Sequence, residues 1–142
     1  MLHSKQTIVT LIALVLAAAL AACGGERPGA SPGLDGTEWV LISLNGTSLV
    51  EGTNITLTFA EGRVNGFAGC NTYNAAYTSD GSTFTSETPA ATEMACSAPA
   101  GVMEQEQCYL GFLGDVTVYR IVGSQLRLET GDGRALVFTA QE

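Results

Sequence analysis

Hydrophobic and polar residues alternate along much of the chain beyond residue 36, which is the pattern of half-buried β-strands. Residues 55–59 are the clearest case, because Ile, Leu and Phe there alternate with Thr. Comparable apolar runs lie at residues 39–42, 64–67, 73–77, 116–122, 126–128 and 135–139, with a short piece at Phe84. Turn-forming sequences such as Asn45-Gly46 and Gly131-Asp132-Gly133 separate these runs. The pattern therefore predicts several short antiparallel strands.

One stretch between the strands has the period of a helix. Pro99 lies near its predicted start, where the missing N–H costs nothing, and Gly114 suits its end. The apolar side chains on one face of this helix are Val102, Met103, Tyr109, Leu110 and Leu113. We predict an α+β fold: a curled antiparallel sheet, forming a partial barrel or roll, with the helix packed on its open face or end.

The N-terminus has the pattern of a bacterial lipoprotein signal. Lys5 precedes an apolar run at residues 8–22, and small residues lead into Cys23. A transmembrane helix would need about 20 apolar residues, and an ordinary signal peptide would need no cysteine at the cleavage site. We therefore expect removal of residues 1–22 and lipidation of Cys23. Several acyl chains, which bacterial lipoproteins usually carry, would anchor the protein stably in a membrane.

The remaining chain divides into a tether and one domain. Residues 23–35 are rich in Gly, Pro, Ser and Ala and predict a flexible tether, followed by a single domain at 36–142. Gly24 stands where inner-membrane lipoproteins of Gram-negative bacteria usually carry Asp. We expect a location in the cell envelope, on the outer membrane facing the periplasm in a Gram-negative cell and otherwise on the outer face of the cell membrane.

Composition excludes several kinds of chemistry. His3 and Lys5, the only histidine and lysine, both lie in the segment to be removed. The mature chain therefore has no histidine base, no Cys–His pair, no Schiff-base lysine and no histidine metal ligand. Three thiolates without a close Cys-x-x-Cys pair make a poor zinc site, so we expect neither metal nor cofactor. Five arginines against fourteen acidic residues make nucleic acid an unsuitable partner.

Three cysteines remain in the domain, and the exported location permits disulfides. Cys96 precedes the helix and Cys108 lies well along it. At about 1.5 Å per residue the two would be more than about 13 Å apart, beyond the reach of about 7 Å between bridged Cα atoms. Cys108 falls on the helix face of Glu104 and Gln107, so we predict a free, partly accessible thiol.

Several motifs resemble those of the META domain family, the HslJ-like proteins. The motifs are Gly66-Phe67-Ala68-Gly69-Cys70-Asn71-Thr72-Tyr73, Thr92-Glu93-Met94-Ala95-Cys96-Ser97-Ala98-Pro99, Gly36-Thr37-Glu38-Trp39, Leu44-Asn45-Gly46, and Glu106 with Tyr109-Leu110. The resemblance implies a small antiparallel β structure with a helix, and many members are lipoproteins. Roles in heat shock, drug resistance and envelope functions have been proposed for the family, which has no common active site. Cys70 and Cys96 match the family's two motif cysteines, so the resemblance implies a disulfide between them; two buried reduced thiols are the alternative.

Glu106 lies near the centre of the apolar face of the predicted helix. A carboxylate that faces a core must be hydrogen-bonded, paired or protonated. One hypothesis is a structural acid that accepts hydrogen bonds from backbone N–H groups or pairs with an arginine; the other is a protonated acid that works in a pocket. Asn71, close to Gly69, is expected to hold a turn by bonding to the backbone.

These observations favour a membrane-anchored, non-enzymatic protein that binds an envelope component and acts during stress. A second hypothesis is a helper or inhibitor module that acts on a secreted or outer-membrane protein through a strand edge or groove. A third is an enzyme that uses Glu106 or Cys108.

Overall fold

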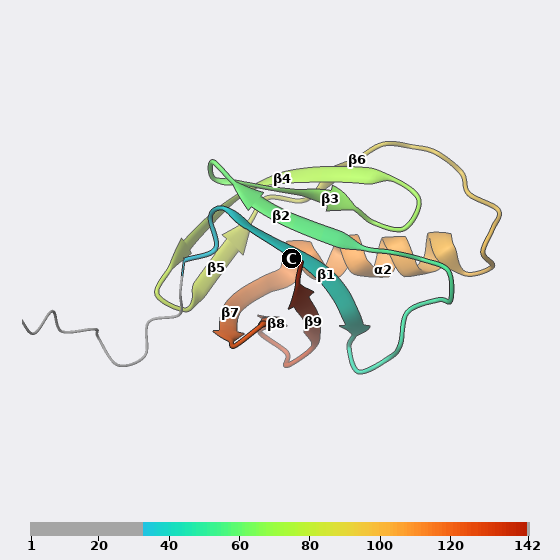
Figure 1. The fold of residues 1–142 in the computed structure, drawn as a ribbon. Coiled ribbons are helices and arrows are strands. Elements are labelled where there is room, and N and C mark those ends of the chain that lie inside the picture. Colours follow the sequence, from blue (N-terminus) through green and yellow to red (C-terminus); the bar gives the residue numbers. More distant parts are fainter. Residues whose placement is uncertain (1–32, 142) are drawn as a thin grey trace, which may run out of the picture.

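The computed structural model describes residues 33–141, which form a β-barrel with one α-helix (Figure 1). The strands are β1 (Thr37–Leu44), β2 (Thr56–Ala60), β3 (Arg63–Phe67), β4 (Thr72–Asp80), β5 (Thr83–Ser86), β6 (Ala90–Ala91), β7 (Val116–Val122), β8 (Gln125–Thr130) and β9 (Ala135–Ala140). The helix, α2 (Val102–Asp115), leads directly into β7. The predicted signal segment 1–22 and Cys23 lie outside the described residues.

All strand pairings are antiparallel, and eight strands close into a barrel. Their order is β3, β2, β1, β9, β8, β7, β5 and β4, and pairing of β3 with β4 closes the ring. β6 lies outside this ring and pairs with β4 alone. The predicted α+β class with a curled antiparallel sheet is confirmed. The sheet goes further than the predicted partial barrel or roll, because the ring is complete.

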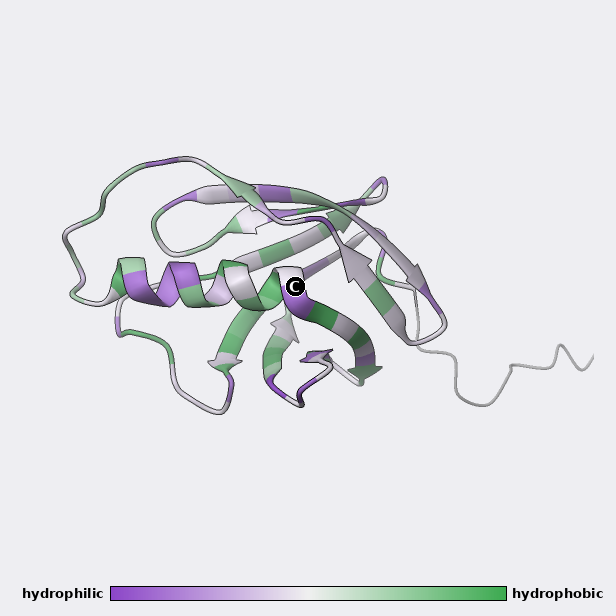
Figure 2. Cartoon of the chain, turned by 180° about the vertical axis from the view of Figure 1, so that it is seen from behind, coloured by the Kyte–Doolittle hydropathy of each residue, from purple (hydrophilic) through white to green (hydrophobic). Residues whose placement is uncertain are grey.

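Alternating side chains fill the barrel. Leu57 and Phe59 of β2 and Leu136 and Phe138 of β9 are completely buried, and the residues between them, Thr58 and Val137, are only partly buried. This is the period of two expected of strands that have one buried face. Hydrophobic and hydrophilic residues alternate along the strands in Figure 2 for the same reason.

The helix lies across the barrel and contributes to the same core (Figure 2). Tyr109, Phe112 and Leu113 belong to the hydrophobic cluster that fills the barrel. α2 begins at Val102, after Gly101 in a left-handed conformation, and so starts three residues beyond Pro99. No helix among residues 33–141 is long and apolar enough to cross a membrane.

The folded domain begins slightly before the predicted boundary. Leu34 is 1% exposed and packs in the core, and Gly36 donates a backbone hydrogen bond to Phe59. The predicted tether, residues 23–35, therefore overlaps the folded domain at Leu34. A single leucine in a segment rich in Gly and Pro carries no periodic signal, although it buries as much apolar surface as any core leucine.

Candidate functional site

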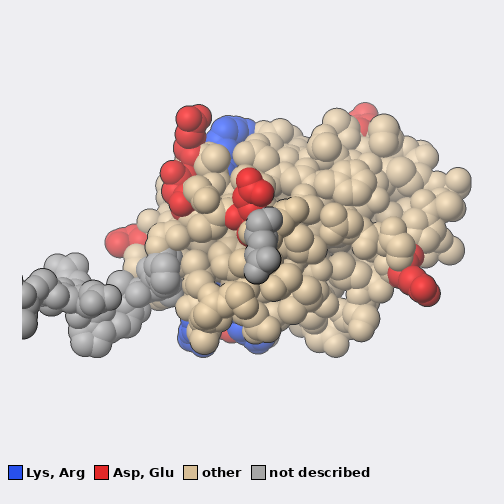
Figure 3. Space-filling view, in the orientation of Figure 1, with Lys and Arg blue, Asp and Glu red and all other residues tan. Residues whose placement is uncertain are grey.

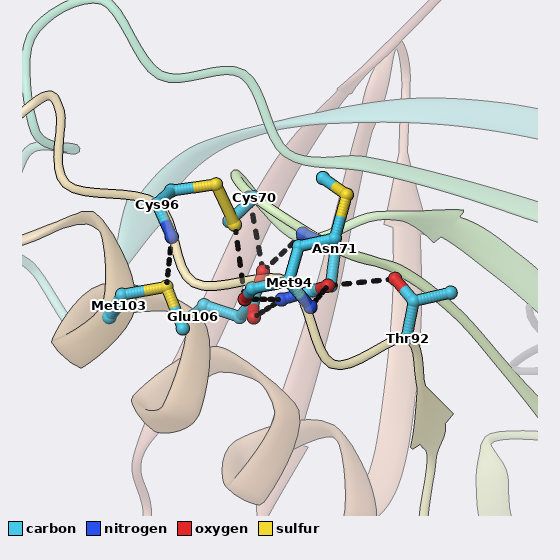
Figure 4. The surroundings of a disulfide bond; sticks show 7 residues. All are labelled: Cys70, Asn71, Thr92, Met94, Cys96, Met103 and Glu106. Carbon is cyan, nitrogen blue, oxygen red and sulfur yellow. Dashed lines mark hydrogen bonds between the residues drawn. A yellow bond between two sulfur atoms is a disulfide. The ribbon is translucent and has the colours of Figure 1, made fainter.

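Glu106 projects from α2 toward the turn between β3 and β4 (Figure 4). Its side chain is 4% exposed. One carboxylate oxygen accepts hydrogen bonds from the backbone N–H groups of Cys70 at 3.0 Å and Asn71 at 2.6 Å. The other oxygen accepts one from the Asn71 side-chain amide at 2.6 Å. All three partners are donors, which is what an ionised carboxylate requires in a buried position.

The side chain of Asn71 is also buried, and its amide group is fully hydrogen-bonded. Its Nδ2 donates to Glu106 and to the backbone oxygen of Met94 at 3.1 Å. Its Oδ1 accepts from the N–H of Met94 and from the hydroxyl of Thr92, both at 2.7 Å. Asn71 therefore does more than the local turn role expected from the sequence, because it fastens a segment more than twenty residues away in the chain.

A disulfide joins Cys70 to Cys96 next to this hydrogen-bonded cluster. The Cα atoms are 6.0 Å apart, and the bridge spans 26 residues of sequence. Cys70 is buried, whereas Cys96 is partly exposed and its N–H donates to the sulfur of Met103. The pairing is the one implied by the family resemblance. The disulfide and Asn71 together fasten the segment between β6 and α2 to the β3–β4 turn (Figure 4).

Gln105, which the sequence analysis did not select, is a second buried polar anchor on α2. It is 7% exposed; its Oε1 accepts from the Val50 N–H at 2.6 Å, and its Nε2 donates to the Thr53 hydroxyl at 2.9 Å. These bonds hold the long β1–β2 connection against the helix. Glu106 and Gln105 are adjacent in the sequence and fasten different loops, so α2 is a support for both.

Tyr73 of β4 and Tyr109 of α2 form another buried polar contact. Their hydroxyl oxygens are 2.6 Å apart, and the Tyr73 hydroxyl donates to the backbone oxygen of Thr56 at 2.9 Å. Burial raises the pKa of both phenols, because the phenolate would lose its hydration. The two groups therefore stay neutral and serve as internal hydrogen-bonding groups.

Gly66 makes this contact possible. A Cβ atom at position 66 would lie 2.0 Å from the backbone oxygen of Thr56 and 2.8 Å from the hydroxyl of Tyr73. Such distances are too short for any side chain. Gly66 therefore lets two neighbouring strands, β2 and β3, and the hydroxyl of Tyr73 approach one another closely.

Cys108 is apart from these groups. It is a free, exposed thiol on α2, on the outward face shared with Glu104 and Gln107. Residues 33–141 contain no lysine or histidine that could activate it.

A surface cluster surrounds Arg134 in the turn between β8 and β9. Its guanidinium bonds to Asp132 at 2.8 Å and to Asp115 at 3.1 Å, and it lies 4.3 Å from the centre of the Phe112 ring. Hydrogen bonds from Thr130 and Arg134 lower the pKa of Asp132. These groups satisfy one another, and in residues 33–141 no set of three His, Cys, Asp or Glu side chains could hold a metal ion.

A family model for the META domain matches residues 32–142. The chain belongs to the META domain family. The META match covers the whole barrel, the helix and both cysteines of the disulfide. Glu106, Asn71, Cys70 and Cys96 all fall in the family motifs, so the fastened segment lies inside the matched domain.

Two solved structures resemble this META domain. An NMR structure of a protein from Burkholderia xenovorans is 31% identical, with a TM-score of 0.60, over 76% of this chain and 83% of that one. A second NMR structure is 22% identical, with a TM-score of 0.61, over 75% of this chain and 90% of that one. No curated protein matches. The likeness to the second NMR structure, at 22% identity, concerns the fold alone.

Proposed function

We propose that this protein is a lipid-anchored META-domain lipoprotein that acts in the cell envelope by binding another envelope component, without catalysis. The observation that carries the non-catalytic part is the state of Glu106. Its carboxylate is buried and accepts three hydrogen bonds from Cys70 and Asn71. It is occupied in holding the fold and has no free face for a substrate.

The binding part of the proposal is supported by how the buried polar groups are used. Asn71, Glu106 and the disulfide immobilise a segment that is itself exposed. A rigid, exposed segment is better suited to a partner than to a reaction, because rigidity lowers the entropy lost on association. The anchor on Cys23 would place this surface at a membrane.

A second candidate is a helper or inhibitor of a secreted or outer-membrane protein. It is favoured by β6, a two-residue strand that pairs with β4 on one side only. An unpaired strand edge is a common site for recognising an extended peptide. An enzyme that uses Cys108 is disfavoured, since residues 33–141 contain no lysine or histidine that could assist the thiol.

The first experiment is capture of the lipidated protein from gently solubilised native membranes, with the Cys23→Ala variant as control. We expect the natural protein in the membrane fraction with a defined envelope protein bound, and the variant in the soluble fraction without it. Equal membrane association of both forms would contradict the anchor. Membrane association without any bound protein would contradict the binding role.

A second variant tests the enzyme hypothesis. Cys108→Ala leaves the fold intact, because the side chain is exposed and unbonded. We expect the variant to correct the defect of a deletion strain as well as the natural protein does. Failure to correct it, with normal amounts of folded protein in the membrane, would favour thiol chemistry.

A further inference from the structure

Residues 90–95, here called the β6 segment, are all exposed and yet firmly held. Met94 is 59% exposed, the second largest value among the large hydrophobic residues that the structure describes. Exposed side chains gain little from the hydrophobic effect, so burial does not hold this segment in place. The bonds from Asn71 and the disulfide at Cys96 hold it instead.

The backbone of the β6 segment has one paired and one unpaired edge. The N–H of Thr92 donates to Thr72 at 3.0 Å, and both backbone groups of Met94 bond to the Asn71 amide. Because successive residues of a strand direct their N–H and C=O groups to opposite sides, those of Ala91 and Glu93 point away from β4. Within residues 33–141 these outward groups have no hydrogen-bond partner. They form a short, open strand edge.

Acidic residues dominate the sequence around this edge, and the one cation beside it, Arg63 of β3, is hydrogen-bonded to Asn74, the strand partner of Ala90. Residues 64–119 contain no lysine or arginine, and their acidic residues are Asp80, Glu87, Glu93, Glu104, Glu106 and Asp115. Glu87 and Glu93, both exposed, lie just before and within the segment. Much of the surface visible in Figure 3 is uncharged, so the few charged side chains dominate the local electrostatic potential. Pairing with a second copy would bring like charges together, whereas a cationic strand would be attracted.

We propose that the β6 segment binds an extended, lysine- or arginine-bearing segment of a partner protein by strand addition. The outward groups of Ala91 and Glu93 supply main-chain hydrogen bonds, Glu93 pairs with a cationic side chain, and Met94 supplies an apolar contact. Asn71 and the disulfide hold the edge in the binding conformation before the partner arrives. The inference rests on the proposed binding function and specifies the kind of partner.

A synthetic peptide tests this edge directly. A nine-residue, end-capped peptide of alternating valine and lysine is titrated into the isotopically labelled protein and followed by NMR. We expect the largest shifts at the amides of Ala91 and Glu93. A peptide with glutamate in place of lysine, and one with its central valine replaced by proline, should each bind at least tenfold more weakly. Shifts centred elsewhere, or no binding, would overturn the proposal.

Two variants separate strand pairing from general attraction. Ala91→Pro removes an outward N–H and leaves the inward bonds of Ala90 and Thr92 in place, so it should weaken peptide binding at least tenfold. Glu93→Lys should do the same without changing the backbone. The matched control is Glu51→Lys, an exposed acid in the β1–β2 connection, which should change affinity less than twofold. Equal losses in Glu51→Lys and Glu93→Lys would overturn the proposal in favour of a diffuse electrostatic effect.

Sedimentation of the unliganded protein tests the competing occupant, a second copy of the chain. We expect a monomer, and a dimer that Ala91→Pro abolishes would overturn the cationic-partner proposal. Failure of this strand-addition proposal can be distinguished from failure of the proposed binding function. If an envelope partner binds the Ala91→Pro variant normally in the membrane capture, the protein keeps its binding role but the β6 edge is not the binding site.

Discussion

The side-chain amide of Asn71 pairs with both the N–H and the C=O of Met94, as the backbone of a neighbouring strand would. The two bonds measure 2.7 and 3.1 Å, and the remaining donor of the amide is held by Glu106 at 2.6 Å. One buried side chain thus extends the β4–β6 pairing beyond the end of β6 and links it to α2. Its orientation depends on the carboxylate behind it, so Asn71 and Glu106 act as a unit.

Replacing Asn71 by Asp tests this unit. The substitution keeps the shape but turns the donor that faces Glu106 and Met94 into a second acceptor. A buried repulsive contact should lower the free energy of unfolding by about 3 kcal/mol or more. Urea unfolding measures the loss. Asn74→Asp, in an exposed position on the following strand β4, is the control and should cost less than about 1 kcal/mol. Equal costs at both positions would contradict the role of Asn71.

The Glu106→Gln variant separates a structural from a catalytic role. The neutral amide presents an NH₂ group to donors of Cys70 or Asn71, leaving at least one buried N–H without an acceptor. We expect a loss of about 2–3 kcal/mol in the free energy of unfolding. Glu104→Gln, on the exposed face of the same helix, should change it by no more than about 0.5 kcal/mol. Unchanged stability in Glu106→Gln would contradict the structural role.

The strands and the helix were predictable because each buries one face and so carries its own period. Leu57 and Phe59, or Leu126 and Leu128, alternate with polar neighbours whatever the rest of the chain does. Closure of the barrel was not predictable, because it depends on pairings such as Thr83 with Val118, which carry no local signal. Nor did the two alanines of β6 show any alternation.

The buried polar positions were only partly predictable. Glu106 was identifiable because a charge on an apolar helix face needs partners. Gln105 was not, since a glutamine beside the apolar face is ordinary and its partners, Val50 and Thr53, are more than fifty residues away. Asn71 was assigned a local role for the same reason: a side chain's hydrogen-bond partners are set by tertiary contacts that spacing does not reveal.

Removing the disulfide should weaken the domain without abolishing its fold. In the paired variant Cys70→Ala with Cys96→Ala, the unfolded chain regains the freedom of a loop of about 25 residues, which costs about 3 kcal/mol. The bonds from Asn71 to Met94 should keep the β6 segment partly ordered. Urea unfolding gives the stability, and amide exchange at residues 90–96 gives the local effect. Cys108→Ala is the control; a similar loss there would contradict the assignment.

Adding a methyl group at Gly66 should be among the most damaging small changes. The Cβ of Gly66→Ala would lie 2.0 Å from a backbone oxygen of Thr56, so two strands would have to separate. We expect a loss of about 3 kcal/mol or more. The matched control is Gly111→Ala in α2, where a Cβ meets nothing within 4 Å. It should raise stability by up to about 1 kcal/mol through helix propensity. A stable Gly66→Ala protein would show that β2 and β3 can shift apart.

Alkaline pH should unfold the domain through its buried tyrosines. Burial raises the pKa of Tyr73 and Tyr109 above the ordinary value of 10.0, so the folded state binds more protons than the unfolded state above that pH. Their stabilisation is therefore complete below about pH 10 and is lost as the pH rises further, by about 1.4 kcal/mol per pH unit for each tyrosine. The domain contains no lysine to complicate this range. Urea unfolding between pH 9 and 11.5 measures the slope, and Tyr109→Phe should make it shallower by one proton. An unchanged slope in that variant would mean that Tyr109 ionises as readily in the folded protein as in the unfolded chain.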